Sequence, residues 1–247
     1  MKQHIDSIPL WDAYKTVCEC PLWALERKNE DEYVDNFLGA SVMEPDRRVE
    51  VNEKGFCPRH FRRMFEAGNR LGLALMTDTY MKRTIERLEK TVKDAAAVGE
   101  GEAKKPLIRR VGRRAAGLTG CADEIESIAR GCVFCERLDT TMERYVYTLV
   151  YMYKHEADFR EALKNSKGFC LKHFAQTLRA APEQLSGEAL KTFVDLVTSL
   201  QMDSLKRVEK DLEWFTLKFD YRNRDKPWGN SQDAVERGIN KMRGNSV

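Results

Sequence analysis

The amino-acid sequence predicts an all-α protein, a helical bundle built from two pseudo-symmetric repeats. Apolar residues recur at helical spacing through several long stretches, and no stretch shows the period of two that is typical of a half-buried strand. A Gly-Phe-Cys-x2-His-Phe motif also occurs twice, at residues 55–61 and 168–174. An internal repeat with only two copies favours a closed pair over an open solenoid.

The expected helices follow from these patterns. Residues 44–54 are polar, contain a proline and are expected to form a loop. The two longest helices, 71–98 and 189–219, are expected to form an antiparallel spine, the first with Met81, Ile85, Leu88 and Val92 along one face. Shorter helices are expected over 11–17, 22–38, 138–152, 155–163 and 233–242, and one is expected to begin near Pro58.

The repeats and the segments between them give a predicted division of the chain. It comprises a first helical Cys/His repeat (1–98), a basic linker (99–120), a second helical Cys/His repeat (121–220) and a C-terminal capping tail (221–247). The two repeats are expected to pack together as one domain.

Composition excludes some classes of protein. With 33% charged and 42% hydrophobic residues, the chain is typical of soluble globular proteins, and no window approaches the roughly 18 to 20 apolar residues of a membrane span. We expect no membrane association and a cytoplasmic location. Six of the seven cysteines lie in short pairs or near a histidine, a spacing that favours metal ligands over disulfides in a reducing compartment.

The second repeat carries the clearer metal motif. Cys132 and Cys135 form a Cys-x2-Cys pair, and Cys170 and His173 form a Cys-x2-His pair. Two such pairs can complete a tetrahedron around one ion, so we predict a main site from these four residues that holds zinc. A 4Fe-4S cluster with one histidine ligand is the alternative cofactor.

The first repeat offers a second set of donors, Cys18, Cys20, Cys57 and His60. It departs from the other copy because Trp23 stands where the second cysteine of the pair is expected. Cys18 can substitute for that cysteine. Alternatively, Trp23 packs in place of a metal and the remaining thiols have no ligand role.

The motifs favour a metal-binding protein that acts as a binding or scaffold module over an enzyme. No hydrolase triad and no phosphate-binding glycine loop is present. The alternative is an iron–sulfur, thiol-redox or metal-handling protein that uses the same cysteines, because a Cys-x2-Cys pair at a helix start also lowers a thiol pKa. Cys121 has no such partner.

Two segments are candidates for partner contacts, and we expect a protein partner. The linker concentrates basic residues, a pattern that also allows nucleic-acid binding but has no interleaved aromatic residues: Lys104, Lys105, Arg109, Arg110, Arg113 and Arg114. In the tail, Tyr221 and Trp228 are expected to cap the bundle. The alternative is a partner contact through Arg222, Asp225 and Trp228.

The sequence resembles a bacterial family of unknown function. Its members carry Cys-Pro-Leu-Cys-x-Leu-Glu and Gly-Phe-Cys-x2-His units and a Phe-Asp-Tyr-Arg and Pro-Trp-Gly tail. Residues 20–26, both Gly-Phe-Cys-x2-His copies and residues 219–229 carry the resemblance here. It supports the extent of the domain and the choice of ligands but implies no reaction. Trp23 is the departure from the family pattern.

Overall fold

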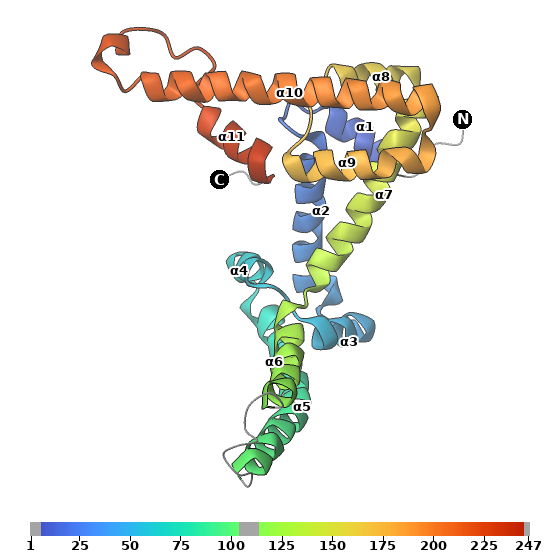
Figure 1. The fold of residues 1–247 in the computed structure, drawn as a ribbon, viewed down its shortest axis with the longest axis vertical. Helices are drawn as coiled ribbons and strands as arrows, with labels where there is room; N and C mark the ends of the chain where they lie inside the picture. The colour runs from blue at the N-terminus through green and yellow to red at the C-terminus, as the bar shows by residue number, and fades with distance from the viewer. Residues whose placement is uncertain (1–5, 104–113, 245–247) are drawn as a thin grey trace. The chain divides into compact units, whose positions relative to one another are not determined.

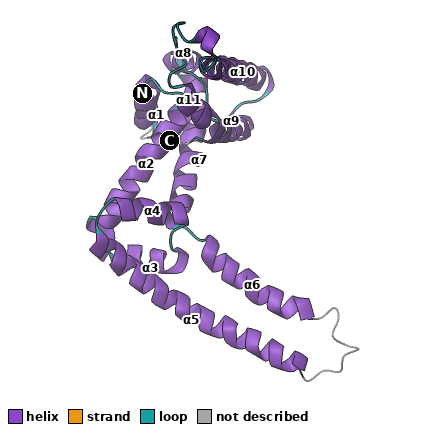
Figure 2. Cartoon of the chain, turned by 90° about the vertical axis from the view of Figure 1, so that its left-hand side faces the viewer, coloured by secondary structure: helices purple, strands orange, loops and turns teal. Residues whose placement is uncertain are grey.

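The computed structural model describes residues 6–103 and 114–244. Within these ranges the regular structure is helical, with no strand, so the predicted all-α class is confirmed (Figures 1 and 2). The α-helices are α1 (Ser7–Lys15), α2 (Pro21–Leu38), α3 (Pro45–Lys54), α4 (Pro58–Glu66), α5 (Arg70–Ala103), α6 (Arg114–Arg130), α7 (Val133–His155), α8 (Ala157–Lys164), α9 (Leu171–Gln184), α10 (Gly187–Leu217) and α11 (Ala234–Arg243).

The chain divides into two compact units. Unit 1 comprises Met1–Asn29 and Asp139–Val247, and unit 2 comprises Glu30–Leu138. Helix α2 begins in unit 1 and ends in unit 2, whereas α7 begins in unit 2 and ends in unit 1. These boundaries differ from the predicted repeats (1–98 and 121–220), because the apolar faces of α2 and α7 join cores that mix both halves of the sequence. The internal repeat therefore stays a prediction.

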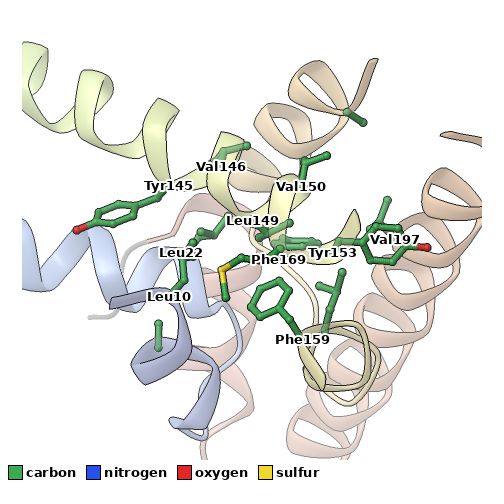
Figure 3. Close-up of a cluster of buried hydrophobic side chains, with 14 of the residues drawn as sticks. Leu10, Leu22, Tyr145, Val146, Leu149, Val150, Tyr153, Phe159, Phe169 and Val197 are labelled. Atoms are coloured by element: carbon green, nitrogen blue, oxygen red, sulfur yellow. The ribbon is translucent and has the colours of Figure 1, made fainter. Parts of the chain in front are cut away.

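The core of unit 1 gathers large apolar side chains from both ends of the chain (Figure 3). Phe159 of α8 is fully buried, and the rings of Trp11 and Tyr14 from α1 pack against it edge-on, with centroids 5.4 and 5.0 Å away. Leu22 of α2 and Leu149 of α7 are also fully buried in this cluster. Helix α1 is thus held against α8.

A turn before α9 is fixed against α10 in the same unit. Gly168 has a φ of +78°, a conformation that a residue with a Cβ resists. The Gln201 side chain donates to the carbonyl of Phe169 and accepts from its N–H, both at 3.1 Å. These bonds set where α9 begins, and therefore where Cys170 lies.

Unit 2 is organised around Phe134 at the start of α7. Its ring is fully buried and packs edge-on against Phe37 and Phe56, each with centroids 4.9 Å away. The backbone N–H of Val133 donates to the carbonyl of Gly55 at 3.0 Å. This single hydrogen bond joins the start of α7 to the turn before α4.

Two connecting segments are more helical than the sequence predicted. The expected loop 44–54 is α3, because Pro45 suits a first helical turn and the helix buries Val51, which is 1% exposed. At the expected linker, residues 99–103 continue α5 and residues 114–120 begin α6. Gly117 permits this pairing of helices, since a Cβ there would lie 3.0 Å from Val98. Most of the basic run, residues 104–113, lies outside the described residues.

The two long helices pack within their own units. In unit 2, α5 contacts α6 and α3, and in unit 1, α10 contacts α11 and α9. The antiparallel spine of these two helices stays a prediction. The apolar stripe of α5 is also largely exposed, with Met81, Ile85 and Val92 at 58%, 51% and 59%. Among the described residues, no helix is long and apolar enough to cross a membrane.

Replacing Phe159 by alanine tests the core of unit 1. Because the ring is fully buried, its loss should lower the free energy of unfolding by about 3–5 kcal/mol. A urea titration followed by circular dichroism measures this change. Tyr221, which is 85% exposed, supplies the control, since Tyr221→Ala should change the free energy by less than about 0.5 kcal/mol. Equal stability of the two variants would contradict the assigned core.

Candidate metal sites

The structure brings seven cysteine and histidine donors into two groups. Cys57, His60, Cys132 and Cys135 meet in unit 2, and we call them the four-donor site. Cys20, Cys170 and His173 meet in unit 1, and we call them the three-donor site. Within each group the donor atoms all lie within 4.8 Å of one another.

The pairing within each group corrects the sequence prediction. We expected Cys132 and Cys135 to join Cys170 and His173, and Cys18 and Cys20 to join Cys57 and His60. Instead, Cys132 and Cys135 meet Cys57 and His60, and Cys20, without Cys18, meets Cys170 and His173. The reason is the rigidity of the intervening helix. Helix α7 has 23 residues and is therefore about 35 Å long. The short α8 and the turn after it do not return the chain along the length of α7, so Cys170 and His173 do not reach Cys132 and Cys135.

Each donor of the four-donor site lies at a helix start. Cys57 is the N-cap residue of α4 and His60 lies in its first turn, while Cys132 and Cys135 flank the start of α7. The hydrogen bond between Val133 and Gly55 holds the two helix starts together. The positive end of each helix dipole favours the thiolate form that binds metals.

The distances between the donors fit one tetrahedral ion. Nδ1 of His60 lies 3.1, 3.3 and 3.6 Å from the sulfurs of Cys132, Cys57 and Cys135, and the sulfurs of Cys57 and Cys135 are 3.9 Å apart. Around zinc, with bonds of about 2.3 Å to sulfur and 2.0 Å to nitrogen, a tetrahedron has edges of about 3.8 Å between sulfurs and 3.5 Å between sulfur and nitrogen.

Charges in the four-donor site are strongly coupled. Burial opposes a charged His60, but the Cys132 thiolate and a carboxylate outweigh it and raise the pKa of the imidazole to about 9. Burial also opposes ionisation of Cys132, but His60 and nearby backbone N–H groups lower the pKa of the thiol to about 6. Burial and the Cys132 thiolate raise the pKa of Cys135.

A carboxylate lies behind each imidazole. Oε1 of Glu30 lies 2.8 Å from Nε2 of His60, and Oε2 of Glu26 lies 3.2 Å from Nε2 of His173. In both histidines Nδ1 therefore faces the sulfurs while Nε2 faces a carboxylate. This is the usual arrangement around metal-binding histidines, where the outer carboxylate fixes the ring and its tautomer.

Sequence reasoning missed Glu26 and Glu30. They are four residues apart on α2, one at the edge of each unit, and the burial of Glu30 leaves it 8% exposed. A signal for Glu26 was present, because it ends the Cys-Pro-Leu-Trp-Ala-Leu-Glu unit that begins at Cys20. Glu30 has no comparable signal beyond its helical spacing from Glu26.

The three-donor site is completely buried, with Cys20, Cys170 and His173 each 0% exposed. Nδ1 of His173 lies 3.2 Å from the sulfur of Cys170 and 3.5 Å from that of Cys20. A hydrogen bond from the Cys20 thiol and the contact with His173 lower the pKa of Cys170 to about 4, against the effect of burial. Burial, together with Cys170, raises the pKa of Cys20.

Trp23 stands one turn after Cys20, where Cys135 stands relative to Cys132. Its backbone N–H lies 3.3 Å from the Cys20 sulfur. Gly244, the left-handed C-cap residue of α11, lies against both the Trp23 indole and the Cys170 sulfur. A Cβ built on Gly244 would lie 2.8 Å from Cδ1 of Trp23 and 3.3 Å from the sulfur of Cys170. Helix α11 therefore closes the three-donor site.

The closing helix is anchored by a buried lysine. Lys241 is 1% exposed, and its ammonium donates to the carbonyls of Glu19, at 2.7 Å, and Lys167. It also lies 3.4 Å from the Glu19 carboxylate. These contacts hold α11 to the residue before Cys20 and to the turn before Cys170.

The remaining predicted residues lie outside both groups. Cys18 is half-buried, burial raises its pKa, and it does not join the donors around Cys20. Cys121 is half-buried in α6.

In the tail, Trp228 packs against Phe215, with ring centroids 5.7 Å apart, whereas the predicted cap residue Tyr221 is exposed. Arg222 is exposed and pairs with Asp220 at 2.6 Å. The partner contact through Arg222, Asp225 and Trp228 stays a prediction.

The fold and the donor groups together define an all-helical protein with two Cys/His clusters, one of them fully buried, that could hold metal ions. The chain belongs to DUF6062, a family of unknown function, whose model matches residues 1–247. The family named by resemblance is thus one of unknown function, as expected. No curated protein and no solved structure matches the chain.

Replacing Lys241 by alanine should destabilise unit 1. The change leaves the carbonyls of Glu19 and Lys167 without the ammonium donor and removes the buried cation beside the Glu19 carboxylate, which keeps its contact with Arg207. Breaking a buried pair of this kind costs about 3–5 kcal/mol. Denaturant unfolding measures the loss. Lys210→Ala, at an exposed position of α10, is the matched control and should change stability by less than about 0.5 kcal/mol. A loss below 1 kcal/mol for Lys241→Ala would be at odds with the anchoring role.

Proposed function

We propose that the protein binds zinc at the four-donor site, and that the ion fastens the start of α4 to the start of α7. The observation that carries this proposal is the match between the distances among the four donor atoms and the edges of a zinc tetrahedron. Glu30 behind His60 adds support, since outer carboxylates orient the histidines of metal sites.

The role we propose for this zinc is structural. Four protein donors fill a tetrahedral ion and leave no position for a substrate or a reactive water. A closed site of this kind stabilises a fold, because the free energy of metal binding becomes free energy of folding. We therefore propose a binding or scaffold module and not an enzyme. All seven cysteines are free, as expected of a protein in a reducing compartment such as the cytoplasm.

A protein partner fits the exposed side chains of unit 2. Met81, Ile85 and Val92 lie at helical spacing on α5 and are each more than half exposed. Ile125 of α6 adds to the exposed apolar area at 44%. Contiguous exposed apolar side chains are typical of interaction surfaces. We propose that α5 and α6 carry the scaffold's contact surface, while nucleic-acid binding by the basic run stays a prediction.

The alternative function is that of an iron–sulfur or thiol-redox protein using the same cluster. The specific observation in its favour is the pair of sulfurs at Cys57 and Cys135, only 3.9 Å apart. The same compactness argues against a 4Fe-4S cluster, because four iron atoms need donors that are farther apart than those of a single ion. Oxidation of this dithiol is therefore the stronger form of the alternative.

Elemental analysis of protein purified without oxygen tests the zinc proposal. We expect colourless protein with zinc at the four-donor site, loss of that zinc in Cys135→Ser, and a lower melting temperature after chelation, since removing the ion removes its share of the folding energy. Cys121→Ser is the control and should keep both its zinc and its melting temperature. Brown protein that contains iron would favour the alternative, and metal-free protein with reduced thiols and an unchanged melting temperature would refute the proposal.

Glu30→Gln tests the outer carboxylate. The amide keeps the size of the side chain but removes the charge behind His60, so the affinity for zinc should fall by about 10–100-fold. Competition with a chromophoric chelator measures the affinity. Glu32→Gln, on the same helix at an exposed position, should leave it unchanged. If both variants bind zinc as tightly as the unmodified protein, Glu30 has no role in the site.

A further inference from the structure

The two donor groups differ in a way that implies two different ions. We propose that the three-donor site binds copper(I), held by the sulfurs of Cys20 and Cys170 and by Nδ1 of His173. Three features of the site favour this ion: the number of donors, their chemistry, and the groups that close its remaining side. None of these features depends on zinc at the four-donor site.

The donor chemistry suits copper(I). Thiolates are soft ligands that select copper(I), zinc or iron–sulfur clusters, and imidazole also binds copper. The three donor atoms lie within 4.8 Å of one another, with Nδ1 of His173 at 3.2 and 3.5 Å from the two sulfurs. Copper(I), a d¹⁰ ion, is satisfied by three soft ligands in a plane. The Glu26 carboxylate lies 3.2 Å from Nε2 of His173, and the imidazole presents Nδ1 to the sulfurs.

The environment disfavours zinc at this site. Zinc held by three protein ligands takes a water or a substrate as its fourth ligand. Here all three donor residues are 0% exposed, and Trp23 stands three residues after Cys20, as Cys135 stands three residues after Cys132 in the four-donor site. Gly244 lies against the Trp23 indole and the sulfur of Cys170. The closed side of the three-donor site therefore favours copper(I), which needs no fourth ligand.

The site is also built to stay closed. Lys241 ties α11 to the carbonyls of Glu19 and Lys167, the first of which directly precedes Cys20. Gly244 can cover the site because it takes a φ of +75°, which ends α11 in a left-handed turn. Exclusion of water protects copper(I) from exchange with competing ligands, so the arrangement favours tight retention of the ion.

Copper titration of the zinc-loaded, reduced protein tests the proposal. Copper(I) is supplied as its bicinchoninate complex, which competes with isolated surface thiols, and one equivalent per chain is added under nitrogen. We expect the full-length protein to take up this equivalent while its zinc stays bound. Cys170→Ser and Cys20→Ser should each lose the copper and keep the zinc, which also reports that unit 2 is folded. Cys121→Ser and Cys18→Ser should behave like the unmodified protein.

A substitution at Trp23 gives the converse test. Trp23→Cys restores the Cys-x2-Cys spacing of Cys132 and Cys135 and thereby supplies a fourth donor, so it should gain one zinc per chain over the unmodified protein. Trp23→Phe keeps an aromatic ring without a donor and should gain none. The gain is read from elemental analysis and does not require copper.

Several outcomes would overturn the proposal. One is a second zinc in the unmodified protein that copper(I) does not displace. Another is copper uptake that survives Cys170→Ser, which would assign the copper to other thiols. A third is the absence of any gain in Trp23→Cys. Loss of zinc from the four-donor site in Cys57→Ser, with copper uptake unchanged, would leave both proposals standing, so each can fail alone.

Discussion

Two helices that each belong to both compact units constrain the rest of the structure. Helix α2 starts among the residues of unit 1 and ends among those of unit 2, and α7 does the reverse. Each helix therefore contributes apolar side chains to two cores, Leu22 and Phe37 from α2 and Leu149 and Phe134 from α7. Because the cysteines stand at the helix starts, this connectivity decides which donors meet.

Helix α2 supports both clusters, although its cysteine belongs to only one of them. Glu26 and Glu30 lie one turn apart and face the imidazoles of His173 and His60. Two carboxylates on one rigid helix orient two histidines that are far apart in the sequence. A helix can do this without strain, since residues four apart share a face.

The sequence predicted the helical class and all seven donor residues of the two clusters, together with Cys18, which joins neither, because both the class and the donors depend on local patterns. The grouping of those donors depends on how far a helix carries the chain. The 34 residues between Cys135 and Cys170 include most of helix α7, which is about 35 Å long, and the spacing alone does not reveal this length. Helix α3 was missed because its sequence is polar and its single buried side chain, Val51, gives no periodic signal. Glu30 was missed because a carboxylate acts here through a histidine and carries no motif of its own.

Each cluster combines donors from both halves of the sequence, and this affects the order in which the two clusters can form during synthesis. His60 and Cys132 are 72 positions apart, whereas Cys20 and His173 are 153 apart. Since each doubling of a closed loop costs only about 0.6 kcal/mol of chain entropy, the longer closure is nearly as favourable as the shorter one. Its delay comes instead from the order of synthesis: the four-donor cluster is complete once α7 has begun, while Cys20 waits for His173, which follows 153 positions later.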